Sequence, residues 1–479
     1  MIVYCPPSVH TTWPVRHSVA WLLDLLIAAY VVVLLVSGLT ELDLGPLTPD
    51  RLEKPILLLL VAVPIRIAIG GRSWLQNGLA RAVPDVAALR ARAVERIPPA
   101  VLDVLVVVIA SRLATFAIAF VANLVFPPGR IRGWQMPFEY RRFAEIFAAW
   151  DSGWYFDIAK RGYYFHAGGQ SSIAFFPLYP MLMRAGAFPF GGSDRSLWLS
   201  GIVVSCTAFV LALIVLHRFT ERVFGSRETA RRAIIYLAVF PFSLFFTRVY
   251  TESIFLLTTV LAISRAYDRH WVRAGLWGAM ATLCRPNGIL IGLPLALMAL
   301  EWEGNPPLRT LAGRMAALLP LPLALAGYSF YVYTLSGDPL AWLSAQAHWG
   351  NSIGHPPWRL LLTMIGQLVK HGWYDYFFVA PDAPFRLFHG LTALLFLIFI
   401  PAIFKRLGVA MGAYVLVSLL VPLSASALEG IGRYAAVLFP AFMLAGTVKS
   451  QRAHELILIV LSHFHALFIC LFVTLRPIY

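Results

Sequence analysis

The chain has few charged residues for its length. Asp, Glu, Lys and Arg together make up 13% of its 479 residues, whereas soluble globular proteins carry about 25%. Hydrophobic residues account for 59%, and the mean hydropathy is +0.73. This composition excludes an ordinary soluble domain and predicts a protein that crosses a lipid bilayer several times.

The chain also lacks the motifs of several large enzyme classes. Its four cysteines stand alone, without a CxxC pair or a metal-ligand spacing: Cys5, Cys206, Cys284 and Cys470. Neither a disulfide framework nor a zinc site is therefore predicted. The P-loop, GxSxG, HExxH and GxGxxG patterns are absent, which leaves nucleotide hydrolysis, serine hydrolysis and zinc proteolysis without support. We expect no metal and no cofactor.

Lysine is scarce, and the formal net charge of +15 comes mainly from arginine. In a soluble protein this charge would suggest a nucleic-acid partner. Here the basic residues gather in short linkers between apolar segments, which is typical of cytoplasmic loops facing anionic lipid. These linkers are 71–98, 218–232, 265–273, 303–314 and 405–407. We therefore expect no nucleic-acid partner and place loops 126–196 and 336–385 on the non-cytoplasmic side.

About thirteen apolar segments approach the length that a helix needs to cross ~30 Å of hydrocarbon. They lie near 19–38, 55–70, 99–125, 197–217, 233–249, 251–268, 273–284, 288–302, 315–335, 386–404, 408–424, 434–448 and 455–474. The sequence thus predicts an all-α polytopic membrane protein. The start of the chain lacks a signal-peptide pattern, so we expect the first segment to persist as a helix. We divide the chain into an N-terminal extension, 1–98, and a membrane core, 99–479.

One long polar and aromatic stretch interrupts the apolar segments, from Trp150 to Tyr163, followed by Ala-Phe-Phe-Pro-Leu-Tyr-Pro at 174–180. If 152–161 is a helix, Asp157 and Arg161 form an i, i+4 ion pair, which favours a structural role for Asp157. Asp151 lies six residues before Asp157 and on another face. This spacing argues against an acid/base pair of carboxylates on the helix.

Two interpretations of Asp151 stay open. Asp is a favoured N-cap, worth ~1 kcal/mol, and Gly162 would be the matching C′ residue. The alternative is a catalytic base beside aromatic rings that bind a sugar. Those rings belong to Trp150, Trp154, Tyr155 and Tyr163. They could equally form a belt at the membrane interface, where aromatic residues are enriched.

Three distant polar clusters are predicted to meet this loop. They are 247–253 (Thr-Arg-Val-Tyr-Thr-Glu-Ser), 285–287 (Arg-Pro-Asn) and 429–434 (Glu-Gly-Ile-Gly-Arg-Tyr). An arginine inside an apolar hairpin costs about 2.5–3.5 kcal/mol unless it is paired or near water. Arg285 should therefore meet a carboxylate or an anionic ligand, and Arg248 and Arg433 are interpreted in the same way. A guanidinium suits a phosphate because it donates two parallel hydrogen bonds.

The remaining candidates have plain structural alternatives. Glu252 opens the segment 251–268, where a carboxylate complements the helix dipole. His348 lies in the second long loop, and a lone histidine is more often structural than functional. Together with Tyr250 and Asn287, these residues complete the set of predicted substrate contacts.

At these residues the sequence resembles the PIG-V-like mannosyltransferase family, whose eukaryotic members add the second mannose of GPI anchors, and especially its shorter prokaryotic relatives. The first family pattern matches Trp150-Asp151, Tyr155, Ile158-Ala159, Gly162-Tyr163 and Ala174 to Pro180. Later elements match Tyr250 to Ser253, Arg285 to Gly288, and Gly432 to Tyr434. The resemblance spans about residues 99–474. Residues 1–98 and the stretch 164–173 depart from the pattern, which leaves acceptor specificity open.

The resemblance implies a GT-C glycosyltransferase fold, a helical bundle with an outward catalytic loop, in which Asp151 matches the acidic residue of the first loop. It also implies a polyprenyl-phosphate sugar donor, typically of mannose, and a bacterial plasma membrane as the location. We expect an inverting transfer to a lipid, glycan or protein hydroxyl, with Asp151 as general base. Arg285 and Arg433 would stabilise the leaving phosphate. Tyr250, Glu252 and the tryptophans would hold the sugar.

Two other functions remain compatible with the sequence. A transporter or flippase of lipid-linked sugars would place ionisable residues along the midplane of the bundle and often shows internal repeats. We find no repeat, and the polar clusters gather at one face. A structural or assembly subunit would bind such a sugar without turnover.

Overall fold

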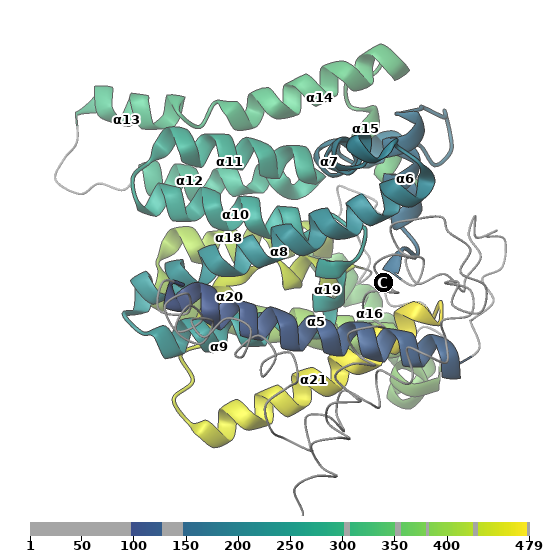
Figure 1. Cartoon of the computed structure of the whole chain (residues 1–479), viewed down its shortest axis with the longest axis vertical. Coiled ribbons are helices and arrows are strands. Elements are labelled where there is room, and N and C mark those ends of the chain that lie inside the picture. The colour runs from purple at the N-terminus through teal and green to yellow at the C-terminus, as the bar shows by residue number, and fades with distance from the viewer. Residues whose placement is uncertain are drawn as a thin grey trace, which may run out of the picture. The chain divides into compact units, whose positions relative to one another are not determined.

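The computed structural model describes residues 97–126, 147–300, 307–349, 356–379, 383–424 and 430–476 (Figure 1). Within these ranges every regular element is a helix, so the all-α prediction is confirmed for this part of the chain. From Ala100 onward the described residues belong to one compact unit. The predicted segments 19–38 and 55–70 lie outside the described residues. The division into 1–98 and 99–479 therefore stays a prediction.

Five stretches of helix are long and apolar enough to cross a bilayer. They are Pro99–Val125 (α5), Asp194–Phe224 (α8), Leu308–Ser336 (α13, Leu308–Ala316, with α14, Pro320–Ser336), Leu387–Leu407 within α17 (Ala383–Leu407), and Gln451–Val473 (α21). Each coincides with a predicted apolar segment and has 21 to 31 residues, which meets the ~20 residues that a spanning helix needs. The chain is thus an integral membrane protein.

The other predicted segments are shorter or broken helices. They form α9 (Arg227–Ala238) with the 3₁₀ helix η6 (Pro241–Thr247), α10 (Glu252–Tyr267), α11 (Trp271–Cys284), η7 (Pro286–Ile291), α12 (Gly292–Ala299), α18 (Val409–Ser424), α19 (Ile431–Ala436) and α20 (Phe439–Ala445). The expectation of one continuous helix over 233–249 is wrong, because α9 and η6 meet at 83°. Pro241 begins η6, and proline can neither donate a backbone hydrogen bond nor continue a helix.

A buried arginine of α5 stabilises this break. Arg112 donates hydrogen bonds to the carbonyl oxygen of Ala238 at 2.5 Å and to that of Ser243 at 3.0 Å. It also reaches the hydroxyl of Ser243 at 2.9 Å. Carbonyl groups at the end of a helix need such partners in a bilayer, where water is absent. Arg112 therefore supports the chain that leads through η6 to residues 247–252, a role that the sequence did not suggest.

The two long loops contain ordered helices that pack on one another. The first holds α6 (Ser152–Arg161), η4 (Ser172–Ala174), α7 (Leu178–Ala187) and η5 (Phe188–Phe190); the second holds α15 (Ala341–Ala345), η8 (Gln346–Trp349), α16 (Pro357–His371) and the π-helical turn η9 (Asp375–Val379). Tyr328 of α14 donates to the carbonyl of Ile173 at 2.8 Å, and Gln346 donates to that of Ala174 at 2.8 Å. The predicted helix 152–161 is confirmed to the residue.

The polar segments lie around α10. This helix packs against α8 and α11 (Figure 1), and it also contacts α12 and η6. Because Glu252 is its first residue and Arg285 follows the last residue of α11, the α10–α11 pairing brings these two side chains together. In turn, α19 contacts η6, which brings Arg433 to the same place.

Candidate active site

Asp151 lies at the start of α6 but does not cap it. Its backbone is αR, with φ −57° and ψ −19°, and its side chain makes no capping hydrogen bond. The preceding residue, Trp150, has φ +62°, a left-handed conformation that is strained for a bulky side chain and costs of order 1–3 kcal/mol. The N-cap interpretation of Asp151 is wrong. Gly162, with φ +88°, does end the helix as predicted.

Arg433 joins two carboxylates from distant segments. Its Nη1 donates to Oδ2 of Asp151 at 2.6 Å, and its Nε donates to Oε1 of Glu252 at 2.7 Å. The guanidinium also lies over two rings, 4.9 Å from the centroid of Phe245 and 4.6 Å from that of Tyr250. Charged hydrogen bonds of this length fix both partners strongly. Arg433 therefore determines where the Asp151 carboxylate lies.

Arg285 approaches Glu252 from the other side. Its Nη1 lies 3.3 Å from Oε1 of Glu252, the oxygen that also accepts from Arg433. The prediction that Arg285 pairs with a carboxylate is confirmed. No other hydrogen bond or ion pair holds its guanidinium among the residues that the structure describes, so its remaining donors are available to a ligand. The ring of Tyr434 lies 5.0 Å from this guanidinium.

Two glycines close to Arg433 and Arg285 in the sequence allow the chain to pack closely against its neighbours. A Cβ on Gly432 would lie 2.0 Å from the ring of Phe242, and one on Gly288 would lie 2.0 Å from the carbonyl oxygen of Ala281. The Gly432 N–H also donates to Nδ1 of the buried His389 at 3.1 Å. His389 and Phe242 were not identified from the sequence, and no local spacing points to them, because α17 and η6 contribute them from distant positions.

The two carboxylates differ in burial. The Asp151 side chain is 23% exposed, whereas that of Glu252 is fully buried. Oε2 of Glu252 is also buried, and it has no hydrogen-bond partner within the described ranges. A buried carboxylate oxygen without a partner is costly unless a ligand donates to it. The geometry therefore leaves the Asp151 carboxylate accessible and the Glu252 carboxylate buried.

Aromatic side chains surround the start of α6. Tyr250 donates to the carbonyl of Ala149 at 3.0 Å, which ties the loop to η6 and α10. The Trp154 ring stacks on Phe175 with centroids 5.5 Å apart. Tyr163 donates to the carbonyl of Phe175 at 2.8 Å. Burial raises the pKa of Tyr155, and the charges of Asp151 and Glu252 add to this, so its phenol stays neutral.

The other predicted residues have varied positions. The Asp157–Arg161 ion pair forms at 3.2 Å, on the surface, as expected. Asn287 lies in η7, with its Oδ1 buried and unpartnered among the described residues. His348 is exposed in η8, and its carbonyl accepts a hydrogen bond from Gln170 at 3.5 Å. Arg248 is buried between the rings of Phe147 and Phe472. Glu429 lies outside the described residues.

The charges of this cluster balance. Asp151 and Glu252 contribute two negative charges, and Arg285 and Arg433 contribute two positive ones. Such a network can offer guanidinium donors to an anionic group of a ligand. Elsewhere in the described part of the chain, no group of three or more His, Cys, Asp or Glu side chains has the arrangement of a metal site.

These features define a polytopic helical membrane protein with a carboxylate–guanidinium site on its loops. Residues 128–298 match the family described as Mannosyltransferase (PIG-V), the family that the sequence motifs resemble. The matched range contains Asp151, Glu252 and Arg285, while Arg433 lies beyond it.

Curated relatives show the same similarity. The chain is 29% identical over 235 residues to GPI alpha-1,6-mannosyltransferase 2 of Cricetulus griseus, covering 44% of this chain and 47% of the relative. It is 24% identical over 254 residues to GPI mannosyltransferase 2 of Drosophila melanogaster, covering 47% and 56%. The chain thus spans about half the length of the curated relatives it matches.

Two solved structures are distantly similar. ArnT from Cupriavidus metallidurans, bound to undecaprenyl phosphate, has a TM-score of 0.42 at 17% identity, covering 74% of this chain and 62% of that one. The oligosaccharyltransferase of Archaeoglobus fulgidus has a TM-score of 0.41 at 13% identity, covering 78% and 56%.

Proposed function

We propose that this chain is a membrane mannosyltransferase of the GT-C type. It transfers the sugar from a polyprenyl-phosphate donor to a hydroxyl acceptor on the non-cytoplasmic face of a bacterial plasma membrane, with inversion. The family match and the mannosyltransferase relatives support the reaction class. The observation that carries the proposal is the link from Arg433 to both Asp151 and Glu252, because it joins the accessible carboxylate to the buried Glu252–Arg285 ion pair.

In the proposed reaction Asp151 takes the proton of the acceptor hydroxyl. The acceptor oxygen bonds to the anomeric carbon as the bond from that carbon to the phosphate oxygen breaks, and the bonding electrons leave with polyprenyl phosphate. A positioned general base contributes about 10²- to 10⁴-fold. The leaving group is already a phosphate, so the reaction needs no general acid.

The contacts support different roles for the two arginines. Arg433 is engaged by both carboxylates, so it positions Asp151. Arg285 makes a single, longer contact with Glu252, and its other donors can bind the phosphate as charge builds on it. Oε2 of Glu252 and Oδ1 of Asn287 are buried and lack partners among the described residues, so they can accept hydrogen bonds from sugar hydroxyls.

The direct test is sugar transfer by the purified chain. Radiolabelled polyprenyl-phosphate mannose and a membrane lipid extract are incubated with the wild type, Asp151→Asn and Asp157→Asn. Asp157→Asn is the matched control, because it removes a carboxylate of the same helix from a surface ion pair. We expect loss of transfer in Asp151→Asn alone, with donor binding retained. Equal transfer by all three proteins would remove Asp151 from the chemistry.

The same assay separates the other functions. A transporter or flippase would move the lipid-linked sugar across a vesicle membrane without forming product, and an assembly subunit would bind it without turnover. Arg285→Ala provides a second check: unchanged donor affinity and turnover would contradict its role at the phosphate.

A further inference from the structure

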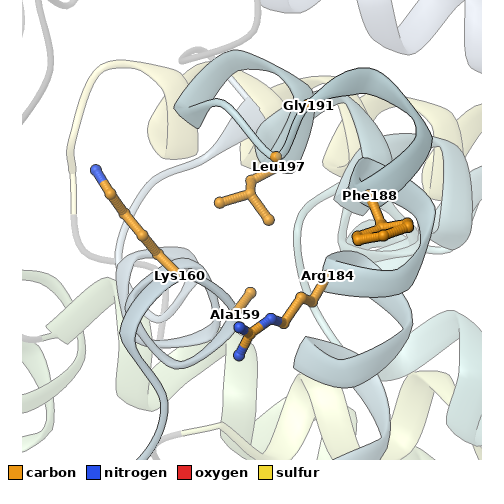
Figure 2. A pocket seen from close by; sticks show the side chains of 7 residues that line it. Ala159, Lys160, Arg184, Phe188, Gly191 and Leu197 are labelled. Carbon is orange, nitrogen blue, oxygen red and sulfur yellow. The ribbon is translucent and has the colours of Figure 1, made fainter.

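A cavity lined by two cationic side chains lies at the other end of α6, away from Asp151. It has a volume of about 290 Å³ and is lined by Ala159, Lys160, Arg184, Phe188, Gly191, Gly192 and Leu197 (Figure 2). This volume is close to the lower limit of ~300 Å³ for small-molecule sites. It is therefore large enough for a headgroup and too small for a whole lipid.

The cavity contains two cations and little to neutralise them. Figure 2 shows the Arg184 guanidinium beside Ala159 of α6. Arg184 makes no ion pair or hydrogen bond with any side chain within the described ranges. Lys160 pairs with Asp194 at 2.6 Å, but this pair is exposed, and exposed pairs of this kind are weak enough for another anion to compete. The chemistry of the cavity therefore suits an anionic group such as a phosphate.

Exposed apolar side chains lie next to these cations. Phe188 lines the cavity and is 83% exposed, and Phe190 and Met181 are 72% and 65% exposed. Gly191 and Gly192 follow, with φ +79° and +63°, a conformation that glycine adopts without strain. This turn leaves Phe188 and Phe190 on the surface. Cations bordered by exposed aromatic rings match an amphipathic ligand with an anionic head and apolar chains, as at membrane interfaces.

The cavity is separate from the candidate active site. Lys160 lies nine residues after Asp151, which is about 13 Å along a helix at 1.5 Å per residue. Nine residues also correspond to about half a turn beyond two full turns, so the two side chains project to opposite sides of α6. Among the described residues, no hydrogen bond or ion pair joins a cavity residue to Asp151, Arg433 or Glu252.

We propose that this cavity binds the headgroup phosphate of an anionic phospholipid of the surrounding bilayer. Arg184 and Lys160 hold the phosphate, and the acyl chains lie over Phe188 and Phe190. Arg184 is the main contact, because it has no competing partner among the described side chains. The bound lipid fixes the end of α6 to α7. This site is independent of the proposed sugar transfer.

Lipid retention on the whole purified chain tests the proposal. The protein is loaded with mixed phosphatidylglycerol and phosphatidylcholine, and native mass spectrometry measures the retained lipids. We expect the wild type to retain phosphatidylglycerol preferentially and Arg184→Gln to lose this preference about fivefold, the factor that ~1 kcal/mol per basic side chain gives. Arg273→Gln is the matched control, since Arg273 is exposed on α11 and has no ion pair in the described part of the chain. It should change retention by less than about twofold.

A second variant and a second ligand identify the occupant. Phe188→Ser keeps both cations and should also weaken retention of phosphatidylglycerol. Inorganic phosphate alone should neither raise the Tm of the detergent-solubilised protein nor displace the lipid at millimolar concentration. Equal losses in Arg184→Gln and Arg273→Gln would show general surface attraction and overturn the proposal. Phosphate binding that Phe188→Ser leaves unchanged would replace the lipid by a free anion and also overturn it.

Discussion

Replacement of Arg433 by methionine should leave a buried charge without its main partner. Glu252 is fully buried and receives a 2.7 Å hydrogen bond from Arg433, whereas its contact with Arg285 is 3.3 Å long. Removing one partner of a buried ion pair costs about 3–5 kcal/mol, because the remaining charge is desolvated and unpaired. We expect a loss of this order for Arg433→Met.

The double variant Glu252→Gln/Arg433→Met separates the charge effect from lost packing. With the carboxylate gone, the cost should fall well below the sum of the single changes, by about 0.5–3 kcal/mol of coupling. The recovery is partial, because Arg285 also loses its partner. The free energy of unfolding can be measured in detergent titrated with SDS, with helix loss followed by circular dichroism.

Arg161→Met is the control for this cycle. Its ion pair with Asp157 has the arginine side chain 72% exposed, and such pairs contribute about 0–1 kcal/mol. If Arg433→Met cost no more than Arg161→Met, or if the effects of Glu252→Gln and Arg433→Met were additive, the account of Arg433 as the link between the carboxylates would be refuted.

Three further outcomes follow from the geometry. Arg112→Leu should destabilise the fold by about a few kcal/mol, since it leaves buried carbonyls at the α9–η6 break without a donor. Thermal unfolding of this variant and of Arg112→Lys in detergent checks this. Gly432→Ala should abolish most transfer, because its Cβ would lie 2.0 Å from the Phe242 ring; unchanged turnover would contradict that constraint. The raised pKa of Tyr155 keeps its phenol neutral up to at least pH ~10, so Tyr155→Phe should not move the alkaline limb of the pH–rate profile.

The site depends on how the helices are broken. If the predicted segment 233–249 were one continuous helix, residues 247–252 would continue in its direction as regular helix. The break at Pro241 instead produces η6 at 83° to α9. As a result Tyr250 reaches the backbone of Ala149, and Glu252 starts α10 beside Arg433. Pro241 interrupts the helix that the apolar segment predicts, and this interruption helps to assemble the site.

The sequence alone determined the features that depend on neighbours along the chain. Apolar runs of about 20 residues specify spanning helices, and those at 99–125 and 455–474 coincide with α5 and α21. The helix over 152–161, the glycine that ends it and the Asp157–Arg161 pair follow from spacing within a few residues. The family motif was also visible, because each of its separate elements is a short local pattern.

Only the tertiary structure showed which residue binds the Asp151 carboxylate. An aspartate before a helix is equally consistent with a cap and with a base, and its hydrogen-bond partner, Arg433, lies 282 positions away. Arg112 likewise donates to oxygens 126 and 131 positions away. Local spacing carries no information about such pairs, because they exist only when packed helices bring a buried charge to the one opposite charge or carbonyl that can satisfy it.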